Sequence, residues 1–180
     1  MKIPYALLVA VLLLASCAQT PPPAPVAKLK DGELPLAADY KSWPVFLKGV
    51  QRADAKQVRD IYINNVGAKA VAGKPFANGT VSVMELYKAK ENADGTLSKG
   101  ADGKLEKGAL LKVFVMGKGD GWGDSAPAGM KNGDWIYGAY LPDGKPAPDP
   151  IVACRGCHLP LGEAKDFVHR YDEYFQSRKS

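Results

Sequence analysis

Apolar and polar residues alternate through the middle of the chain, which is the pattern of β-strands with one buried face. The alternation is clearest in 79–88, where it places Met84 and Leu86 on one face and Val83 on the other. Three other segments are rich in β-branched and aromatic residues and predict further strands: 58–63, 109–116 and 134–141. Gly, Pro, Asn and Asp cluster between the four segments, so turns are expected there.

The pattern becomes helical near the C-terminus. The segment 152–158 is expected to form a short helix. A second helix is expected over 163–177, because its large apolar residues recur at helical spacing: Phe167, Val168, Tyr171 and Tyr174 or Phe175. The chain is therefore expected to have its strands first and its helices last.

Residues 93–100 and 101–108 form a near-repeat, ADGTLSKG followed by ADGKLEKG. The repeat falls between the second and third expected strands, so it predicts a long hairpin loop with a tandem duplication. The block is too short for a repeat fold, and lengthening an exposed loop costs little conformational entropy. A neutral insertion is the favoured interpretation.

Residues 1–16 have the features of a targeting signal. Lys2 precedes an apolar run, 6–15, that is too short to span a bilayer comfortably. The run leads into Leu-Ala-Ser-Cys, with Cys17 at the position where lipoprotein signals are cleaved and lipidated. We therefore expect a lipoprotein signal peptide over 1–16; the alternative is an ordinary secretory signal with an incidental cysteine. The residue after Cys17 is Ala18 and not an aspartate, and this indicates that the lipoprotein is sorted to the outer membrane.

Residues 17–33 are expected to form a tether, because proline and small residues favour extended chain without a core. The folded domain is then expected over 34–180. The composition, 46% hydrophobic and 24% charged, is ordinary for a globular protein. The net charge of +5 is spread along the chain without a basic run, so no nucleic-acid partner is expected.

One short segment carries a specific chemical signature. Cys154, Cys157 and His158 have the spacing Cys-x-x-Cys-His that covalent haem attachment requires. The two thiols add to the porphyrin vinyl groups, and the next residue places an imidazole under the iron. A helix would bring all three side chains to one side, with Gly156 leaving room near the ring. We therefore expect one covalently attached haem c, with His158 as the iron ligand.

Two other uses of the cysteine pair are disfavoured. A thioredoxin-like redox pair would follow a strand near the start of an α/β domain, and that setting is absent. A zinc site needs four ligands. The chain has three cysteines and two histidines, and Cys17 is assigned to the lipid, so a second ligand pair is lacking.

The sixth position of the iron stays open at this point. His169 is the other histidine; we expect it at the surface or at the haem edge, because the chain would have to reverse to carry it across the haem. Met84, Met116 and Met130 precede the motif, whereas small soluble electron carriers have the motif early and the methionine late. Ligation by His and Met is therefore disfavoured but not excluded.

Strands that precede a C-terminal haem motif make the chain similar to the cytochrome P-460 family and its relative, cytochrome c-prime-beta. The resemblance covers about 34–175. It is carried by six segments in a fixed order: 58–63 (VRDIYI), 75–86 (PFANGTVSVMEL), 113–116 (VFVM), 133–135 (GDW), 154–158 (CRGCH) and 166–168 (DFV).

The resemblance implies an α+β fold, an antiparallel β-sheet packed against helices with haem between them. It also implies a five-coordinate iron with an open distal side, and a homodimer. Arg59 matches an arginine near the haem in the family, where its charge would pair with a propionate or steer a small anion; the alternative is a surface arginine. Phe114 and Trp135 are candidates for the distal wall or, equally, for the sheet core.

Met84 stands where cross-linked members of the family have a lysine bonded to the porphyrin. Those members oxidise hydroxylamine and handle nitric oxide, but a thioether cannot form the bond that the amine forms. Met84 is therefore expected to pack against the haem without a covalent bond. Lys88 shares its face but lies two pleat repeats along the strand, about 13 Å away, so it is not expected to substitute.

These features predict a lipid-anchored periplasmic cytochrome whose five-coordinate haem binds a small gaseous or nitrogenous ligand such as nitric oxide. A hydrophobic distal wall favours neutral diatomic ligands over anions. The alternatives are an electron-transfer cytochrome with a six-coordinate haem, and an enzyme that oxidises hydroxylamine or nitric oxide. Membrane contact is expected only through the lipid anchor, and a periplasmic redox partner stays open.

Overall fold

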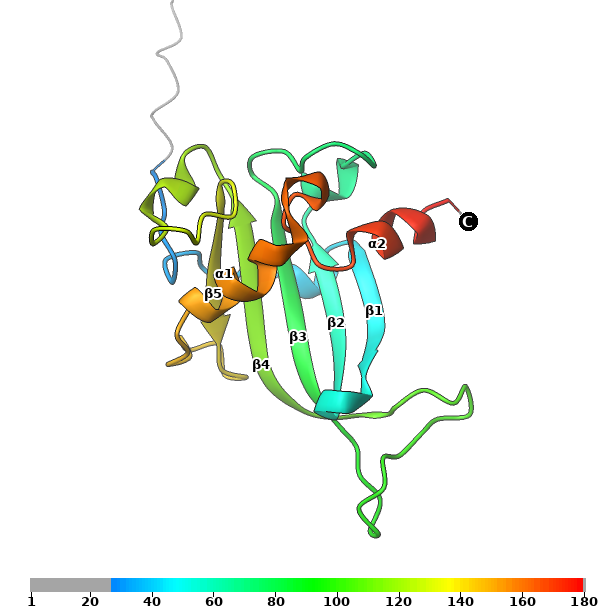
Figure 1. Cartoon of the computed structure of the whole chain (residues 1–180). Coiled ribbons are helices and arrows are strands. Elements are labelled where there is room, and N and C mark those ends of the chain that lie inside the picture. The colour runs from blue at the N-terminus through cyan, green and yellow to red at the C-terminus, as the bar shows by residue number, and fades with distance from the viewer. Residues whose placement is uncertain (1–26, 180) are drawn as a thin grey trace, which may run out of the picture.

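The computed structural model describes residues 27–179, so the expected signal peptide and Cys17 lie outside the described residues. Within them the chain forms a five-stranded antiparallel sheet in the order β1-β2-β3-β4-β5, each strand beside the next (Figure 1). The strands are β1 Val45–Arg52, β2 Gln57–Ile63, β3 Val81–Ala89, β4 Lys107–Lys118 and β5 Trp135–Tyr140. Two helices follow, α1 Val152–His158 and α2 Tyr171–Ser177. The connections contain short 3-10 turns: Tyr40–Ser42, Ala53–Ala55, Gly67–Lys69, Trp122–Ser125, Leu159–Leu161 and Glu163–Lys165.

The four strands that the alternation predicts are present, with bounds that differ by two residues at most, and α1 has the expected bounds. β1 is a fifth strand that the pattern did not predict. Its register shifts twice against β2, between Val45 and Leu47 and between Leu47 and Val50. Gly49 lies in this irregular stretch with a φ of +66°. Such irregularities break the strict alternation on which a sequence-based prediction relies.

The near-repeat forms the long connection between β3 and β4, as the sequence predicts. Two isolated bridges, Glu91 with Leu97 and Lys99 with Leu105, hold it together as a twisted hairpin (Figure 1). Leu105 is buried against Val58 and Ala89 at the end of the sheet. The insertion therefore covers an end of the sheet as well as lengthening a loop.

The continuous helix expected over 163–177 is wrong in its first half. Asp166, Phe167 and Arg170 have φ values of +47°, +56° and +60°, in the left-handed region that a right-handed helix cannot contain. The segment instead makes a 3-10 turn and then a left-handed turn, and α2 begins at Tyr171. The apolar residues at helical spacing are still buried, because the turn and α2 both face the sheet.

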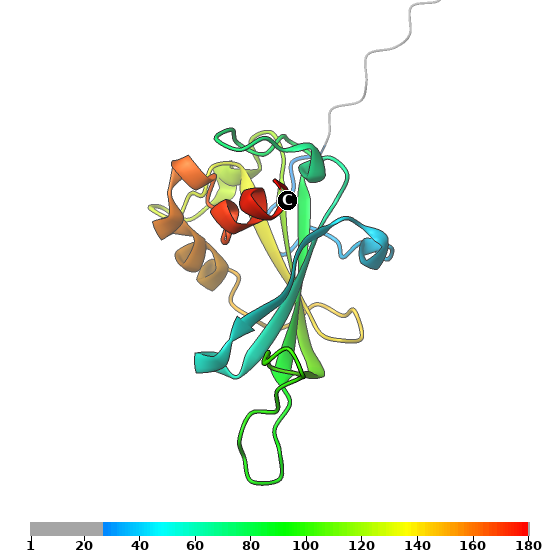
Figure 2. The same cartoon turned by 90° about the vertical axis from the view of Figure 1, so that its right-hand side faces the viewer.

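The sheet is covered differently on its two faces. Both helices lie on one face, and the segment that leads into β1 crosses the other (Figure 2). The helix-side core is aromatic and joins Phe46, Phe76 and Trp135 to Tyr174 and Phe175. The opposite core is smaller and mainly aliphatic, with Leu34, Val83, Val113, Val115 and Ile136. An antiparallel sheet with helices packed on it confirms the α+β class.

The chain is already tied to the fold before Leu34. Gly32 N–H donates to the Tyr137 carbonyl at 2.8 Å, and the Asp31 carboxylate accepts from the Tyr137 N–H at 3.0 Å. Both residues fall in the range expected to be tether. Between residues 27 and 179, no helix has the length and apolar character needed to cross a membrane.

Candidate functional site

The candidate site is built first of all from α1. Positions i, i+3 and i+4 of a helix share one side, so Cys154, Cys157 and His158 project together. Cys154 is half-buried and packs against the aromatic core, whereas Cys157 is exposed. Both thiols are free. The helix thus presents two unpaired thiols and an imidazole to the same surroundings.

Arg155 fixes which way this short helix faces. Its side chain is fully buried, and its Nε and Nη2 donate to the two Asp31 carboxylate oxygens at 2.6 and 3.0 Å. Its Nη1 donates to the Met130 carbonyl at 3.3 Å, and its guanidinium lies 5.5 Å from the centre of the Tyr137 ring. Asn132 completes the anchor, since its amide donates to the Arg155 carbonyl at 3.2 Å. With Arg155 held inward, the cysteines and the histidine must face elsewhere.

His158 has one ring nitrogen committed and one available. Its Nδ1 lies 2.7 Å from the Phe167 carbonyl oxygen, which can only accept, so Nδ1 carries the proton. Nε2 is therefore the atom with a lone pair. Burial lowers the pKa of His158 to about 4, which favours the neutral imidazole. A neutral imidazole with its second nitrogen fixed by a carbonyl is the usual form of a metal-ligating histidine.

His169 lies beside His158 and not across from it. The two imidazole ring centres are 4.7 Å apart in an edge-on arrangement. The ring of Tyr137, on β5, has its centre 5.0 Å from that of His158. Burial lowers the pKa of His169, and the backbone at Cys157 opposes that shift through a hydrogen bond. His169 thus belongs to the same side of the site as α1.

The sheet supplies the other wall. Met84 pairs with Ile61 of β2 and with Phe114 of β4, and directly paired residues of antiparallel strands point to the same face. Ile61 packs against the aromatic core, so this row faces the helix side. Arg59 and Leu86 form the next row on that face. Met84, Phe114 and Arg59 are each partly exposed there.

Arg59 has an unused donor. Its Nη2 donates to the Gln57 side chain at 2.9 Å, but its Nε is buried without a hydrogen-bond partner among residues 27–179. Burial lowers the pKa of Arg59, and the charge of Arg52 lowers it further. Arg59 therefore has a buried donor that no group among residues 27–179 uses, and this donor is free for an anionic group.

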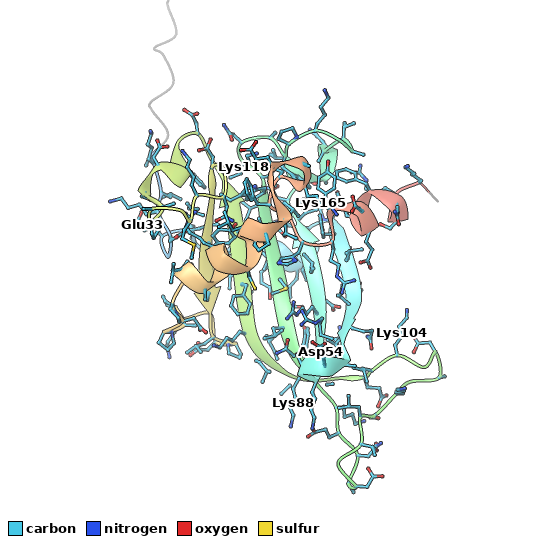
Figure 3. All side chains as sticks on the ribbon, viewed as in Figure 1. Glu33, Asp54, Lys88, Lys104, Lys118 and Lys165 are labelled. Atoms are coloured by element: carbon cyan, nitrogen blue, oxygen red, sulfur yellow. The ribbon has the colours of Figure 1, made fainter. Side chains whose placement is uncertain are left out.

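Two further residues named from the sequence lie away from this wall. Lys88 is at the far end of the sheet from Lys118 (Figure 3), and its ammonium pairs with Glu91 at 2.9 Å. Trp135 is only 1% exposed and packs edge-on against Phe76, so it belongs to the sheet core. Cys17, the expected lipidation site, lies outside the described residues.

These features fit a haem held between α1 and the sheet. The free thiols could bond to the porphyrin edge, and the unprotonated Nε2 of His158 could ligate an iron. The unpartnered Nε of Arg59 could donate to a propionate or another anion. Met84 and Phe114 offer the apolar surface that a porphyrin ring needs.

Three parts of the site escaped sequence analysis. Asp31 lies in the segment 17–33, which was expected to be a tether, and the Phe167 carbonyl belongs to the backbone, which every residue has. Lys118 lies two residues beyond the strand predicted over 109–116, and nothing in the sequence distinguishes it from other lysines. The one available signal was Asp166-Phe167-Val168, which carried part of the family resemblance without indicating a role.

Fold and site together define a class: an α+β protein in which a helix beside the sheet carries cysteines and a histidine at the spacing of haem attachment. Residues 37–170 match the family model described as Cytochrome P460, and the chain belongs to that family. Membership makes haem the cofactor and the chain a haem-binding cytochrome. A comparison with curated proteins found no match.

Proposed function

We propose that the chain is a c-type cytochrome of this family, with one haem bonded to Cys154 and Cys157 and with His158 as the proximal ligand. The observation that carries the proposal is the hydrogen bond from His158 Nδ1 to the Phe167 carbonyl at 2.7 Å. It leaves Nε2 unprotonated and orients the ring on the helix that bears both thiols.

We further propose that the iron is five-coordinate and takes up a small neutral ligand such as nitric oxide. His169 stands beside His158, so it does not serve the opposite side of a haem. The facing sheet row consists of Ile61, Met84 and Phe114, which offer no N–H or O–H donor from their side chains. Few donors near the ligand would leave bound oxygen poorly stabilised, whereas nitric oxide needs no such help.

A second candidate function rests on Met84. Its thioether is on the face toward α1, and Met is a common sixth ligand in electron-transfer cytochromes. If Met84 bound the iron, the haem would be six-coordinate and would carry electrons without binding a ligand. Oxidation of hydroxylamine is less favoured, because the residue at the family's cross-link position is Met84 and not a lysine.

Absorption spectra of the ferric and ferrous protein, with and without nitric oxide, separate these functions. We expect a high-spin spectrum in both oxidation states and a clear change on addition of nitric oxide. A low-spin ferrous spectrum that nitric oxide does not alter would contradict the proposal of ligand binding.

Covalent attachment has its own test. Cys154→Ala combined with Cys157→Ala should abolish the haem stain that survives denaturing gel electrophoresis. His158→Ala is the matched control, because it keeps both thioether bonds while losing the normal proximal ligand. Haem staining that persists in the double variant would exclude covalent attachment through this motif.

We also propose that the protein is exported and held at the outer membrane by a lipid on Cys17, with residues 17–33 as its tether. The support is the sequence before Cys17 and the Ala residue after it. Cys17→Ser should move the protein from the membrane fraction to the soluble fraction. Mass spectrometry of the mature N-terminus should find Cys17 acylated, and a terminus elsewhere would refute the lipoprotein assignment.

A further inference from the structure

A buried ion pair includes Asp166, the residue before Phe167, whose carbonyl accepts from His158. The Lys118 ammonium, at the end of β4, contacts both carboxylate oxygens of Asp166 at 2.8 Å. Their side chains are only 11% and 8% exposed. The Lys118 ammonium also lies 5.6 Å from the centre of the Trp135 ring. Each of these buried charges is stabilised by the other, because either charge buried alone would carry a large desolvation penalty.

The pair holds an unfavourable stretch of backbone. Asp166 and Phe167 are consecutive non-glycine residues in the left-handed region, with φ values of +47° and +56°. Each such residue is energetically unfavourable, and the conformation persists only where surrounding contacts enforce it. Asp166 supplies such a contact on its other side as well, because its Oδ2 accepts from the Phe76 N–H at 2.8 Å.

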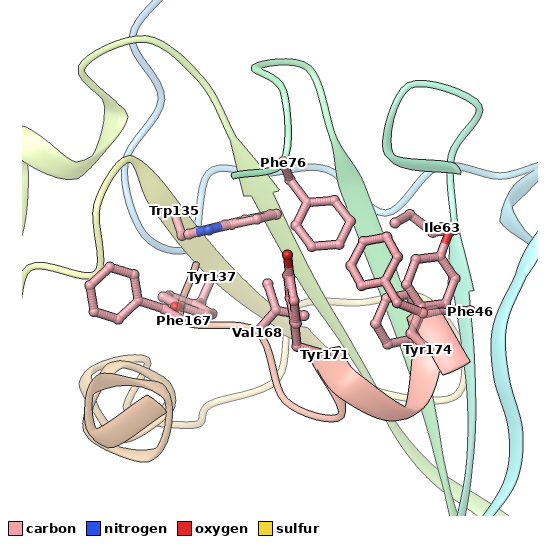
Figure 4. Packing of buried hydrophobic residues seen from close by; sticks show 10 residues of the cluster. Phe46, Ile63, Phe76, Trp135, Tyr137, Phe167, Val168, Tyr171 and Tyr174 are labelled. Carbon is pink, nitrogen blue, oxygen red and sulfur yellow. The ribbon is translucent and has the colours of Figure 1, made fainter. Parts of the chain in front are cut away.

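Phe167 itself is held by packing of its ring and by a backbone hydrogen bond. It is 8% exposed in the aromatic core, where it lies beside Tyr137 (Figure 4). Its N–H donates to the Gly162 carbonyl at 3.0 Å. Phe167 is therefore restrained on two sides, because its own side chain is packed and the residue before it is paired with Lys118.

We propose that Lys118 and Asp166 are positioning residues for the proximal histidine, and that they set the strength of the hydrogen bond from His158 Nδ1. This inference rests on the proposed function, in which His158 Nε2 binds the haem iron. A carbonyl held at 2.7 Å from Nδ1 draws its proton and makes the imidazole a stronger electron donor. The donor strength of the axial ligand in turn tunes the iron's reduction potential and ligand affinity.

The test is the Fe–His stretching band of the ferrous protein in resonance Raman spectra, together with the reduction potential. Asp166→Asn removes the charge but keeps the size, an acceptor for the Phe76 N–H and tolerance of a left-handed backbone. We expect this variant to lower the Fe–His frequency and raise the potential. Lys118→Met should shift both quantities in the same directions. Lys118→Arg, which restores a cation for Asp166, should return them toward the wild-type values.

Lys107→Met is the matched control. Lys107 is also on β4 and pairs with a buried carboxylate, that of Asp60, but this pair lies at the other end of the strand. Its loss should destabilise the fold and leave the Fe–His band unchanged. If Asp166→Asn and Lys118→Met bind haem and keep the wild-type band, Lys118 and Asp166 have no positioning role.

The failure of the proposed function would look different. An Fe–His band that persists in His158→Ala would remove His158 as the ligand and overturn both ideas. A low-spin wild-type ferrous protein without the band would overturn the five-coordinate iron, and the reduction potentials of the same variants would then decide the positioning role. Haem content, measured as the pyridine haemochrome, should stay at the wild-type level in the Lys118 and Asp166 variants, since the thioether bonds do not depend on them.

Discussion

At the scale of single residues, the direction in which a side chain points decides its chemistry. Arg155 and Cys154 are neighbours in the sequence, yet Arg155 is fully buried against Asp31 and Cys154 borders the site. On β3, Met84 faces the helix side, whereas the next residue, Glu85, faces the opposite core. Strand alternation thus separates a thioether on the helix side of the sheet from a buried carboxylate by one position.

We predict that Met84 neither bonds covalently to the porphyrin nor binds the iron. Tryptic mass spectrometry should find a haem peptide that contains Cys154 and Cys157 only, with the mass of an ordinary haem c. Met84→Ala should leave the ferrous protein high-spin, because the thioether packs against the ring without donating to the metal. A third peptide on the haem would contradict the first expectation. A change from low to high spin in Met84→Ala would contradict the second and favour electron transfer.

At the scale of elements, α1 cannot stand alone. It has seven residues, which is too short to be stable in isolation. Contacts from outside the helix hold it, among them the carboxylate of Asp31, before the first strand, and the Phe167 carbonyl, in the turn before α2. The helix that carries the haem motif therefore depends on both ends of the described chain.

Asp31→Ala should lower the free energy of unfolding by about 3 kcal/mol, because it leaves the fully buried Arg155 without its carboxylate partner. Asp143→Ala breaks an exposed ion pair with Lys145 and is the control, expected to change the free energy of unfolding little because water screens the pair. Urea unfolding of the haem-loaded proteins provides the measurement. Equal losses in the two variants would mean that Asp31 does not anchor α1.

At the scale of the whole molecule, each face of the sheet has its own polar centre. The helix side carries the candidate haem site. On the other side, Glu85 is 2% exposed and accepts from the Tyr40 and Tyr87 hydroxyls, each at 2.7 Å. Lys41 lies 3.3 Å from the same carboxylate. Since Tyr40 and Lys41 precede β1, this cluster fastens the N-terminal segment across the sheet.

The cluster predicts how stability depends on pH. Burial, and then the hydrogen bond to Glu85, raise the pKa of Tyr40 and of Tyr87 above the ordinary value of 10.0. A raised pKa means that the stabilisation is complete below pH 10 and is lost as the pH rises further, when only the unfolded tyrosines ionise. We therefore expect the free energy of unfolding to fall above about pH 10.

Glu85 acts at the other end of the pH range. Burial alone would raise its pKa, but hydrogen bonds from Tyr40, Tyr87 and Lys41 outweigh burial and hold the pKa below the ordinary 4.5. Its stabilisation is therefore present above that pH and is lost as the pH falls through the lowered value. Tyr87→Phe should make the free energy of unfolding less dependent on pH at both the acid and the alkaline end, as measured by urea unfolding across that range. If the pH dependence at both ends stays the same as in the wild type, the cluster does not govern it.

The sequence by itself determined the features that depend on neighbours along the chain. Alternation over 79–88 and β-branched and aromatic content in three other segments predicted β2 to β5. The spacing of Cys154, Cys157 and His158 marked the haem motif, and the order of six short segments indicated the family, which the match over 37–170 confirms. These signals survive because a pleated strand and a single turn of helix impose their periods locally.

Only the tertiary structure decided what completes the site. Arg155 meets Asp31 across 124 residues, and such a contact follows from topology and not from any local period. The acceptor for His158 is a backbone carbonyl, which every residue possesses and no sequence pattern marks. The expected helix over 163–177 is interrupted by a left-handed turn at Asp166 and Phe167, where Asp166 contacts Lys118 of β4, and helical spacing reveals neither the turn nor that contact. β1 was missed because its two register shifts break the alternation that marks a strand. Pairing with β2 and packing of Phe46 in the aromatic core hold this irregular strand in place.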